Sequence, residues 1–189
     1  MALWCWVGGR HLLHWPHWLQ HTKASYTERM ETATLRLTGS LEPRDGWSAG
    51  ASCTIAKSVE LLSTRSAFLL MREAFYGATR FEEFVRRAEL TEATASARLH
   101  ELVEHGLLEL EPYQEPGQRT RNRYRLTEKG ADLFPVIVSL MQWGNRWLSD
   151  TGGPAELLHR GCGGVVATEL RCEHGHTVEL ADLDLAATT

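Results

Sequence analysis

Four arginines occupy alternate positions in residues 113–129, which read YQEPGQRTRNRYRLTEK. They are Arg119, Arg121, Arg123 and Arg125. A guanidinium stays charged at physiological pH, and its planar fork of donors fits the oxygens of a phosphate group. The formal net charge of the whole chain is −4, so this positive charge is concentrated on one segment. The spacing therefore suggests the binding of phosphates along one side of an extended segment.

The flanking residues predict that these arginines lie on a β-hairpin. LLELEPY and RYRLT alternate apolar and polar residues, and QEPGQ between them supplies turn residues. Residues two apart share one face of a strand, so the arginines should point outward while Tyr124 and Leu126 face the core. Arg119 and Arg121 are nearest the Pro-Gly tip and should reach furthest. The alternative is a solvated strand face, partly neutralised by glutamates across the hairpin, namely Glu109, Glu111 and Glu115.

Helical periodicity surrounds the hairpin. CTIAKSVELL, SAFLLMREAFYG, TRFEEFVRRA and LTEATASARLHELVEHG repeat apolar residues at helical spacing. Thr79 and Glu82 have the spacing of a capping box, and Thr91 is placed to cap the fourth segment. After the hairpin, Thr127 should cap one long helix, EKGADLFPVIVSLMQWGNRWLSD, bent where Pro135 removes a backbone donor. The predicted fold class is mainly α with a small β-hairpin, in the order of a winged helix-turn-helix.

Several motifs follow one another in a specific order over residues 53–148. A cysteine precedes the first helix, followed by RSAFLLMREAFYGATRFEEF, LTEATASARLHELVEHGLLE, YRLTEKGADLFPVI and the pair Trp143-Gly-x-x-Trp147. This order resembles that of the HxlR-type winged helix-turn-helix transcriptional regulators, relatives of the MarR group. The resemblance implies a homodimer that binds double-stranded operator DNA and usually represses transcription. One departure is Cys53-Thr54, where the family usually has Cys-Pro.

In this fold the helix that begins after Thr91 should lie in the major groove, with base contacts from its N-terminal part. Subtracting the buried stripe leaves the candidates Thr91, Ala93, Thr94, Ala97 and Arg98, with Glu92 at the rim. Because alanine offers only a methyl group, contacts to thymine methyls and DNA shape should carry part of the specificity. Two alternatives remain open: Thr91 acting only as an N-cap, and Arg98 pairing with Glu101.

Cys53 occupies the position of the cysteine with which several members of the family sense electrophiles, quinones or oxidants. A small-molecule signal of this kind requires an accessible thiolate. Lys57 lies one helical turn away and the thiol is near a helix N-terminus, and both features would favour the anion. The alternative is a cysteine packed among apolar residues.

A second set of chemically suited residues lies in the tail sequence HRGCGGVVATELRCEHGH. Its candidate metal ligands are His159, Cys162, Cys172 and His176, with His174 as an alternative fourth ligand. Thiolates and imidazoles at this spacing suit tetrahedral zinc, and four protein ligands would make such a zinc structural. The sequence predicts a small zinc-ribbon-like hairpin, or a hairpin without metal.

Composition and charge limit the remaining possibilities. The chain is 43% hydrophobic and 23% charged, as is usual for a globular protein. No stretch approaches the roughly 18 consecutive apolar residues of a membrane span, and no nucleophile–base pair or phosphate loop suggests an enzyme. We expect a cytoplasmic protein with a disordered extension over residues 1–45, in which Met30 is an alternative start. A DNA-binding and dimerisation domain over 46–150 and a tail over 151–189 should follow.

The long last helix should supply the homodimer interface. Its apolar surface is wider than one small domain covers, and a two-fold operator demands a two-fold protein. The alternative is packing against the first helix within the chain, and we expect both. The expected function is that of a dimeric, sequence-specific DNA-binding regulator, a repressor that responds to a redox or electrophilic small molecule. The alternative is a metal-responsive or protein-interaction module that acts through the Cys/His tail.

Overall fold

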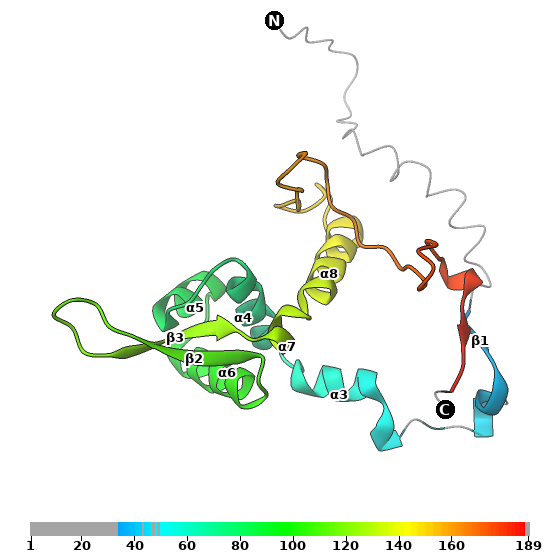
Figure 1. Ribbon diagram of the computed structural model, residues 1–189, viewed down its shortest axis with the longest axis horizontal. Helices are drawn as coiled ribbons and strands as arrows, with labels where there is room; N and C mark the ends of the chain where they lie inside the picture. Colours follow the sequence, from blue (N-terminus) through cyan, green and yellow to red (C-terminus); the bar gives the residue numbers. More distant parts are fainter. Residues whose placement is uncertain (1–33, 43, 47, 49, 188–189) are drawn as a thin grey trace, which may run out of the picture. The chain divides into compact units, whose positions relative to one another are not determined.

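The computed structural model describes residues 34–42, 44–46, 48 and 50–187 (Figure 1). The expectations for residues 1–33, including the alternative start at Met30, lie outside the described residues. The chain divides into two compact units, one composed of Ser48–Ser149 and Ala155–Thr168, the other of Met1–Trp47, Asp150–Pro154 and Glu169–Thr189. The expected domain boundary at residue 150 differs from this division, because 155–168 belong with the helices. Among the described residues, no helix has the length and apolar character needed to cross a membrane.

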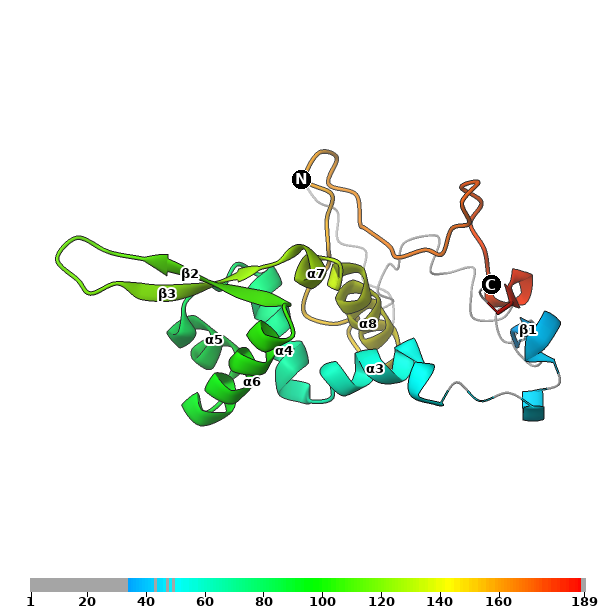
Figure 2. The same cartoon turned by 60° about the horizontal axis from the view of Figure 1, so that its bottom comes forward.

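Three helices form the body of the larger unit. α4 (Arg65–Phe75), α5 (Phe81–Ala88) and α6 (Glu92–Glu104) pack against one another around an apolar core (Figures 1 and 2). The largest fully buried side chains are Phe84, Leu70, Met71, Leu99, Leu107 and Leu108. Burying one such side chain contributes about 1.5–3 kcal/mol, so this cluster fixes the arrangement of the three helices.

The N-terminal cap of α6 is the one predicted from the sequence, whereas the cap of α5 is different. Thr91 Oγ1 accepts a hydrogen bond from the backbone N–H of Thr94 at 3.2 Å, which caps α6. The box expected between Thr79 and Glu82 is wrong. The Glu83 carboxylate accepts instead from the backbone N–H groups of Thr79 at 2.9 Å and Arg80 at 3.1 Å. The box is displaced by one residue because Arg80 is the N-cap of α5.

The predicted hairpin is present and forms the wing. β2 (Leu108–Tyr113) and β3 (Arg121–Leu126) pair antiparallel over their full length. Gly117 at the tip has φ of +77°, the left-handed region that a tight turn of this kind requires. At its base, the backbone N–H of Tyr124 donates to the Thr79 carbonyl at 2.7 Å, which ties β3 to the turn before α5. The tip projects beyond the helices in both views (Figures 1 and 2).

The single bent helix expected after the hairpin is wrong, because the structure has two helices there. α7 (Glu128–Ala131) is a short turn that Thr127 caps, with its Oγ1 accepting from the Gly130 N–H at 3.0 Å. α8 (Phe134–Trp147) follows, and Pro135 lies in its first turn. A proline there removes an N–H that has no helical acceptor, so it begins a new helix instead of bending an old one.

α3 (Thr54–Leu61) precedes this body and buries none of its residues. It joins the N-terminal end of α4 and extends from it on the side opposite α5 and α6 (Figure 2). Tertiary packing usually stabilises a helix of two turns, so the exposure of α3 among the described residues is a feature to explain.

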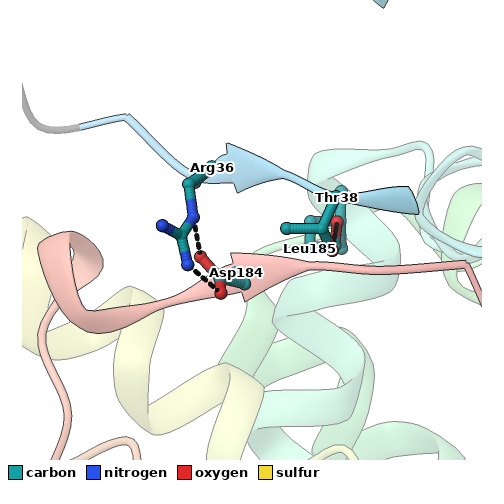
Figure 3. Close-up of polar contacts among 4 residues, drawn as sticks. All are labelled: Arg36, Thr38, Asp184 and Leu185. Atoms are coloured by element: carbon teal, nitrogen blue, oxygen red, sulfur yellow. Dashed lines mark hydrogen bonds and ion pairs between the residues drawn. The ribbon is translucent and has the colours of Figure 1, made fainter. Parts of the chain in front are cut away.

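The smaller unit joins two segments that lie far apart in the sequence. β1 (Arg36–Leu37) pairs in parallel with β4 (Asp184–Leu185). The Arg36 guanidinium binds the Asp184 carboxylate in a bidentate manner. Nε donates to Oδ1 at 2.7 Å and Nη2 donates to Oδ2 at 2.6 Å (Figure 3). This ion pair lowers the pKa of Asp184. The expectation of a disordered extension up to residue 45 is therefore wrong for Arg36–Leu37.

Candidate nucleic-acid interface

The N-terminal end of α6 presents one exposed face. Four of the predicted groove residues are exposed, namely Thr91, Ala93, Thr94 and Ala97, and Glu92 is exposed beside them. The opposite stripe is buried against the core and consists of Ala95, Leu99 and Leu102. This face offers hydroxyl and methyl groups, which suit phosphate contacts and contacts to thymine methyls.

The two threonine hydroxyls on this face, those of Thr91 and Thr94, differ in their hydrogen bonds. Thr91 Oγ1 accepts a hydrogen bond from the Thr94 N–H and donates its proton to Thr94 Oγ1 at 2.9 Å. The hydroxyl proton of Thr91 is therefore already used within the cap. Thr94 Oγ1 receives that bond, and among the described residues its own proton has no acceptor. Thr94 is therefore the better donor for a phosphate or base edge, and Thr91 acts first as a cap.

Arg98 is held on the surface of α6 by a glutamate. Its guanidinium forms an ion pair with Glu101, one turn further along the helix, and the Arg98 side chain is half-buried. This is the pairing that the sequence left open as the alternative to DNA contact. Arg98 can reach DNA only by leaving this carboxylate or by sharing it.

The wing divides its arginines into two pairs. Arg119 and Arg121, at the tip, are exposed and have no ion-pair partner among the described residues. Arg123 and Arg125, nearer the base, both bind one carboxylate of β2: the Nε of each lies 2.9 Å from Glu111 Oε2. The positive charge that is free for an external anion is therefore concentrated at the tip.

Glu111 neutralises Arg123 because the hairpin register brings these two residues together. It lies directly opposite Arg123 in the antiparallel ladder and accepts from its Nε and Nη2, each at 2.9 Å. The hydrogen bonds from Arg123, together with the charge of Arg125, lower the pKa of the Glu111 carboxyl. Of the three glutamates considered from the sequence, Glu111 binds wing arginines, whereas Glu115 binds Arg80.

Arg80 is a residue that the sequence reasoning missed. Its guanidinium forms an ion pair with Glu115 and lies 5.4 Å from the centroid of the Tyr113 ring. Both partners lie near the tip end of the hairpin, so Arg80 braces the wing against the start of α5. No signal in the sequence pointed to this role, because spacing placed the cap at Thr79, and Arg80 is the N-cap only in the structure.

Cys53 is the N-cap of α3. Its Sγ accepts from the Ala56 backbone N–H at 3.4 Å, and the residue is half-buried. Lys57 contributes its backbone N–H, which donates to the Cys53 carbonyl at 3.1 Å. The Cys53 sulfur is therefore part of the hydrogen bonding that begins α3.

The four predicted metal ligands fall into two pairs, one in each unit of the chain. His159 Nδ1 lies 3.2 Å from Cys162 Sγ, within the larger unit. Cys172 and His176 belong to the smaller unit, where the Cys172 N–H donates to the His176 carbonyl at 3.0 Å. Among the described residues, no three histidine, cysteine or acidic side chains form a group that could hold a metal ion. The chain division separates the predicted set into two pairs.

Comparison with known proteins places this geometry in a family. Residues 61–151 match the family described as HxlR-like helix-turn-helix. An uncharacterized HTH-type transcriptional regulator of Mycobacterium tuberculosis is 41% identical over 122 residues, which are 64% of this chain and 76% of that protein. YvaP of Bacillus subtilis, also described as an uncharacterized HTH-type transcriptional regulator, is 30% identical over 93 residues, 49% of this chain and 84% of that protein.

Solved structures agree with these relatives. PA1607, described as a candidate transcription factor, has a TM-score of 0.64 at 32% identity, covering 72% of this chain and 96% of that chain. PA1374 from Pseudomonas aeruginosa, described in the same way, has a TM-score of 0.53 at 34% identity, covering 72% and 92%. The chain therefore belongs to the HxlR-like helix-turn-helix family of transcriptional regulators.

Proposed function

We propose that the protein is a homodimer that binds a two-fold operator in double-stranded DNA, with α6 in the major groove and the wing tip on the phosphates. The observation that carries this proposal is two exposed arginines at the tip, Arg119 and Arg121, which have no ion-pair partner in the part of the chain that the structure describes, on a hairpin that directly follows α6. Cations at that place would position the protein, and the exposed face of α6 would read the bases. The protein acts in the cytoplasm as a repressor, the usual action that the family resemblance implies.

The exposed apolar side chains support the dimer. On α3, Ile55 and Val59 are 75% and 61% exposed. On α8, Leu140, Trp143 and Trp147 are each at least half exposed. Apolar side chains of this size that gather on two helices of one unit mark an interface. A second copy is the partner that fits, because a closed two-fold dimer buries the same face on both subunits and matches a two-fold DNA site.

The signal in this proposal is an electrophilic or oxidising small molecule that reacts with Cys53. The thiol caps α3, and α3 is one of the two helices that carry the proposed dimer surface. Modification of Sγ would remove the bond from the Ala56 N–H and change the start of that helix. The proposal requires that a thiol alkylating reagent changes operator affinity in the native chain and leaves the Cys53→Ala variant unaffected.

The DNA assignment is tested by measuring affinity against salt concentration on DNA fragments footprinted by the protein. Each phosphate contact that is lost should reduce the slope of log affinity against log salt by about 0.9. The double variant Arg119→Ala/Arg121→Ala should therefore lower the slope by about two for each bound protomer. Arg171→Ala is the control, because it removes an exposed arginine of the tail that pairs with Glu169. An unchanged slope in the double variant would show that the wing tip does not contact phosphates.

The dimer is tested separately by sedimentation equilibrium of the purified chain. Trp143→Glu places a charge in the proposed interface and should convert the dimer to a monomer with a native circular dichroism spectrum. Leu170→Glu is the matched control, since Leu170 is also an exposed apolar side chain but lies in the tail. A native chain that sediments as a monomer, or a Trp143→Glu variant that stays dimeric, contradicts this interface.

A further inference from the structure

The tail contains a closed turn that the proposed DNA-binding function does not use. Leu158 and Val165 form an antiparallel bridge that encloses the residues HRGCGG. Inside it, the His159 N–H donates to the Gly164 carbonyl and the Gly163 N–H donates to the His159 carbonyl, both at 2.8 Å. The first and last residues of the turn are therefore fixed by backbone bonds.

Two side chains capable of binding metal converge on this turn. His159 Nδ1 and Cys162 Sγ lie 3.2 Å apart, and both side chains are exposed. Two ligands of one tetrahedral zinc ion, with bonds of about 2.0 Å to nitrogen and 2.3 Å to sulfur, lie about 3.5 Å apart. The two atoms are thus already near the separation that a shared metal ion requires.

The glycines of the turn make room for both side chains. A Cβ at Gly161 would lie 2.9 Å from His159 Cε1, so any larger residue would displace the imidazole. A Cβ at Gly164 would lie 3.4 Å from Cys162 Sγ. The backbone of the turn is therefore shaped around the two candidate ligands.

The hairpin that carries the turn is anchored to α8. The Gln142 amide donates to the Val166 carbonyl at 2.7 Å and accepts from the N–H and the hydroxyl of Thr168, at 3.0 and 2.9 Å. Asn145 donates to the Ala155 carbonyl at 3.2 Å on the incoming side. Because both sides of the hairpin are held by one helix, binding at the turn needs little additional ordering of the chain.

We propose that this turn is a metal site, in which His159 Nδ1 and Cys162 Sγ bind one zinc-like divalent ion. A thiolate and an imidazole are the donors that such an ion prefers over the harder cations. On binding, the Cys162 thiol releases its proton to solvent, and the neutral His159 ring gives the lone pair of Nδ1 to the ion. The proposed site differs from the four-ligand set predicted from spacing, because the turn supplies two ligands and solvent donors complete the coordination.

The test is a titration of the full-length, reduced chain with Co²⁺, which replaces zinc and gives a thiolate-to-metal charge-transfer absorption band. One equivalent of Co²⁺ should produce the band, and added Zn²⁺ should remove it. Cys162→Ala should abolish the band. His159→Ala should weaken Co²⁺ binding by at least about tenfold, since even partners outside the first coordination shell contribute that much.

Two further variants identify the sulfur and the remaining ligands. Cys53→Ala should keep the band, which shows that the α3 cysteine is not its source. If Cys172→Ala/His176→Ala keeps the band, the turn binds with solvent donors. If that variant abolishes the band, the turn does not bind the ion by itself and the proposal fails. No band in the native chain, or a band that survives Cys162→Ala, would overturn the proposal.

Discussion

Arg123 faces Glu111 across the hairpin, and two parallel hydrogen bonds of 2.9 Å join the guanidinium to the carboxylate. Arg125 shares the same carboxylate, so one glutamate occupies two of the four wing arginines. An exposed pair of this kind contributes little to folding, and its larger effect is on which cations are available to DNA.

We expect Glu111→Gln to raise the affinity of the protein for non-specific duplex DNA at low salt. The neutral amide would no longer hold Arg123 and Arg125, and each cation that reaches a phosphate should steepen the salt slope by about 0.9. Electrophoretic mobility shifts over a series of salt concentrations measure both effects.

Glu109→Gln is the matched control for this change. It removes the same charge from the same strand, but Glu109 has no ion-pair partner among the described residues. A rise in the salt slope of equal size in both variants would mean that net charge, and not release of the arginines, is responsible.

Glu83 should make the stability of the winged-helix unit depend on pH. The backbone N–H groups of Thr79 and Arg80 lower the pKa of this carboxyl below its ordinary value of 4.5. A depressed pKa means that the stabilisation is complete above the ordinary value and is lost as the pH falls through the lowered one. Glu83→Gln should cost about 1–2 kcal/mol at neutral pH, and the difference from the native chain should shrink in acid.

Denaturant unfolding at a series of pH values measures this loss. Glu82→Gln is the control, because Glu82 is the neighbour that sequence spacing favoured as the capping residue. Equal losses from the two substitutions at neutral pH would show that the Glu83 bonds do not stabilise α5.

Gly130→Ala should destabilise the protein strongly. A Cβ at this position would lie 2.0 Å from the Leu107 carbonyl oxygen, and that atom belongs to the backbone and cannot rotate away. We expect a loss of about 2–4 kcal/mol and a lower melting temperature by differential scanning calorimetry. Gly144→Ala is the comparison, since a Cβ there meets nothing within 4 Å and should raise helix stability by up to about 1 kcal/mol. A Gly130→Ala variant with native stability would contradict the close approach of α7 to Leu107.

The pair Arg36–Asp184 should protect the β1–β4 strand pair against proteolysis. Arg36→Ala should increase the rate of cleavage near both strands, because the bidentate contact and the neutralisation of Asp184 are lost together. The lowered pKa of Asp184 predicts the same loss in the native chain as the pH falls through that value. The exchange variant Arg36→Asp/Asp184→Arg should restore part of the protection, and cleavage unaffected by any of these changes would exclude a stabilising role.

Much of the local structure could be read from the sequence. The change from helical to alternating periodicity predicted the helices and the hairpin, because each depends on residues within a few positions of one another. The Thr91 cap and the outward face of the wing arginines are local in the same sense. The error at Glu83 is a shift of one residue in where a helix begins, and the error at Pro135 is a helix that begins there where a bend was expected; neighbouring residues alone do not fix such boundaries.

The sequence by itself thus determined the family, the winged-helix order and the segment that carries the positive charge. Tertiary structure decided which of those charges are free. Strand register placed Glu111 opposite Arg123, and Arg125, which lies opposite Glu109, reaches diagonally to the same Glu111 carboxylate. Tertiary structure also paired Arg36 with a carboxylate 148 residues away. Such contacts depend on how segments that are distant in the sequence pack against each other, and residue spacing along the chain does not determine that packing.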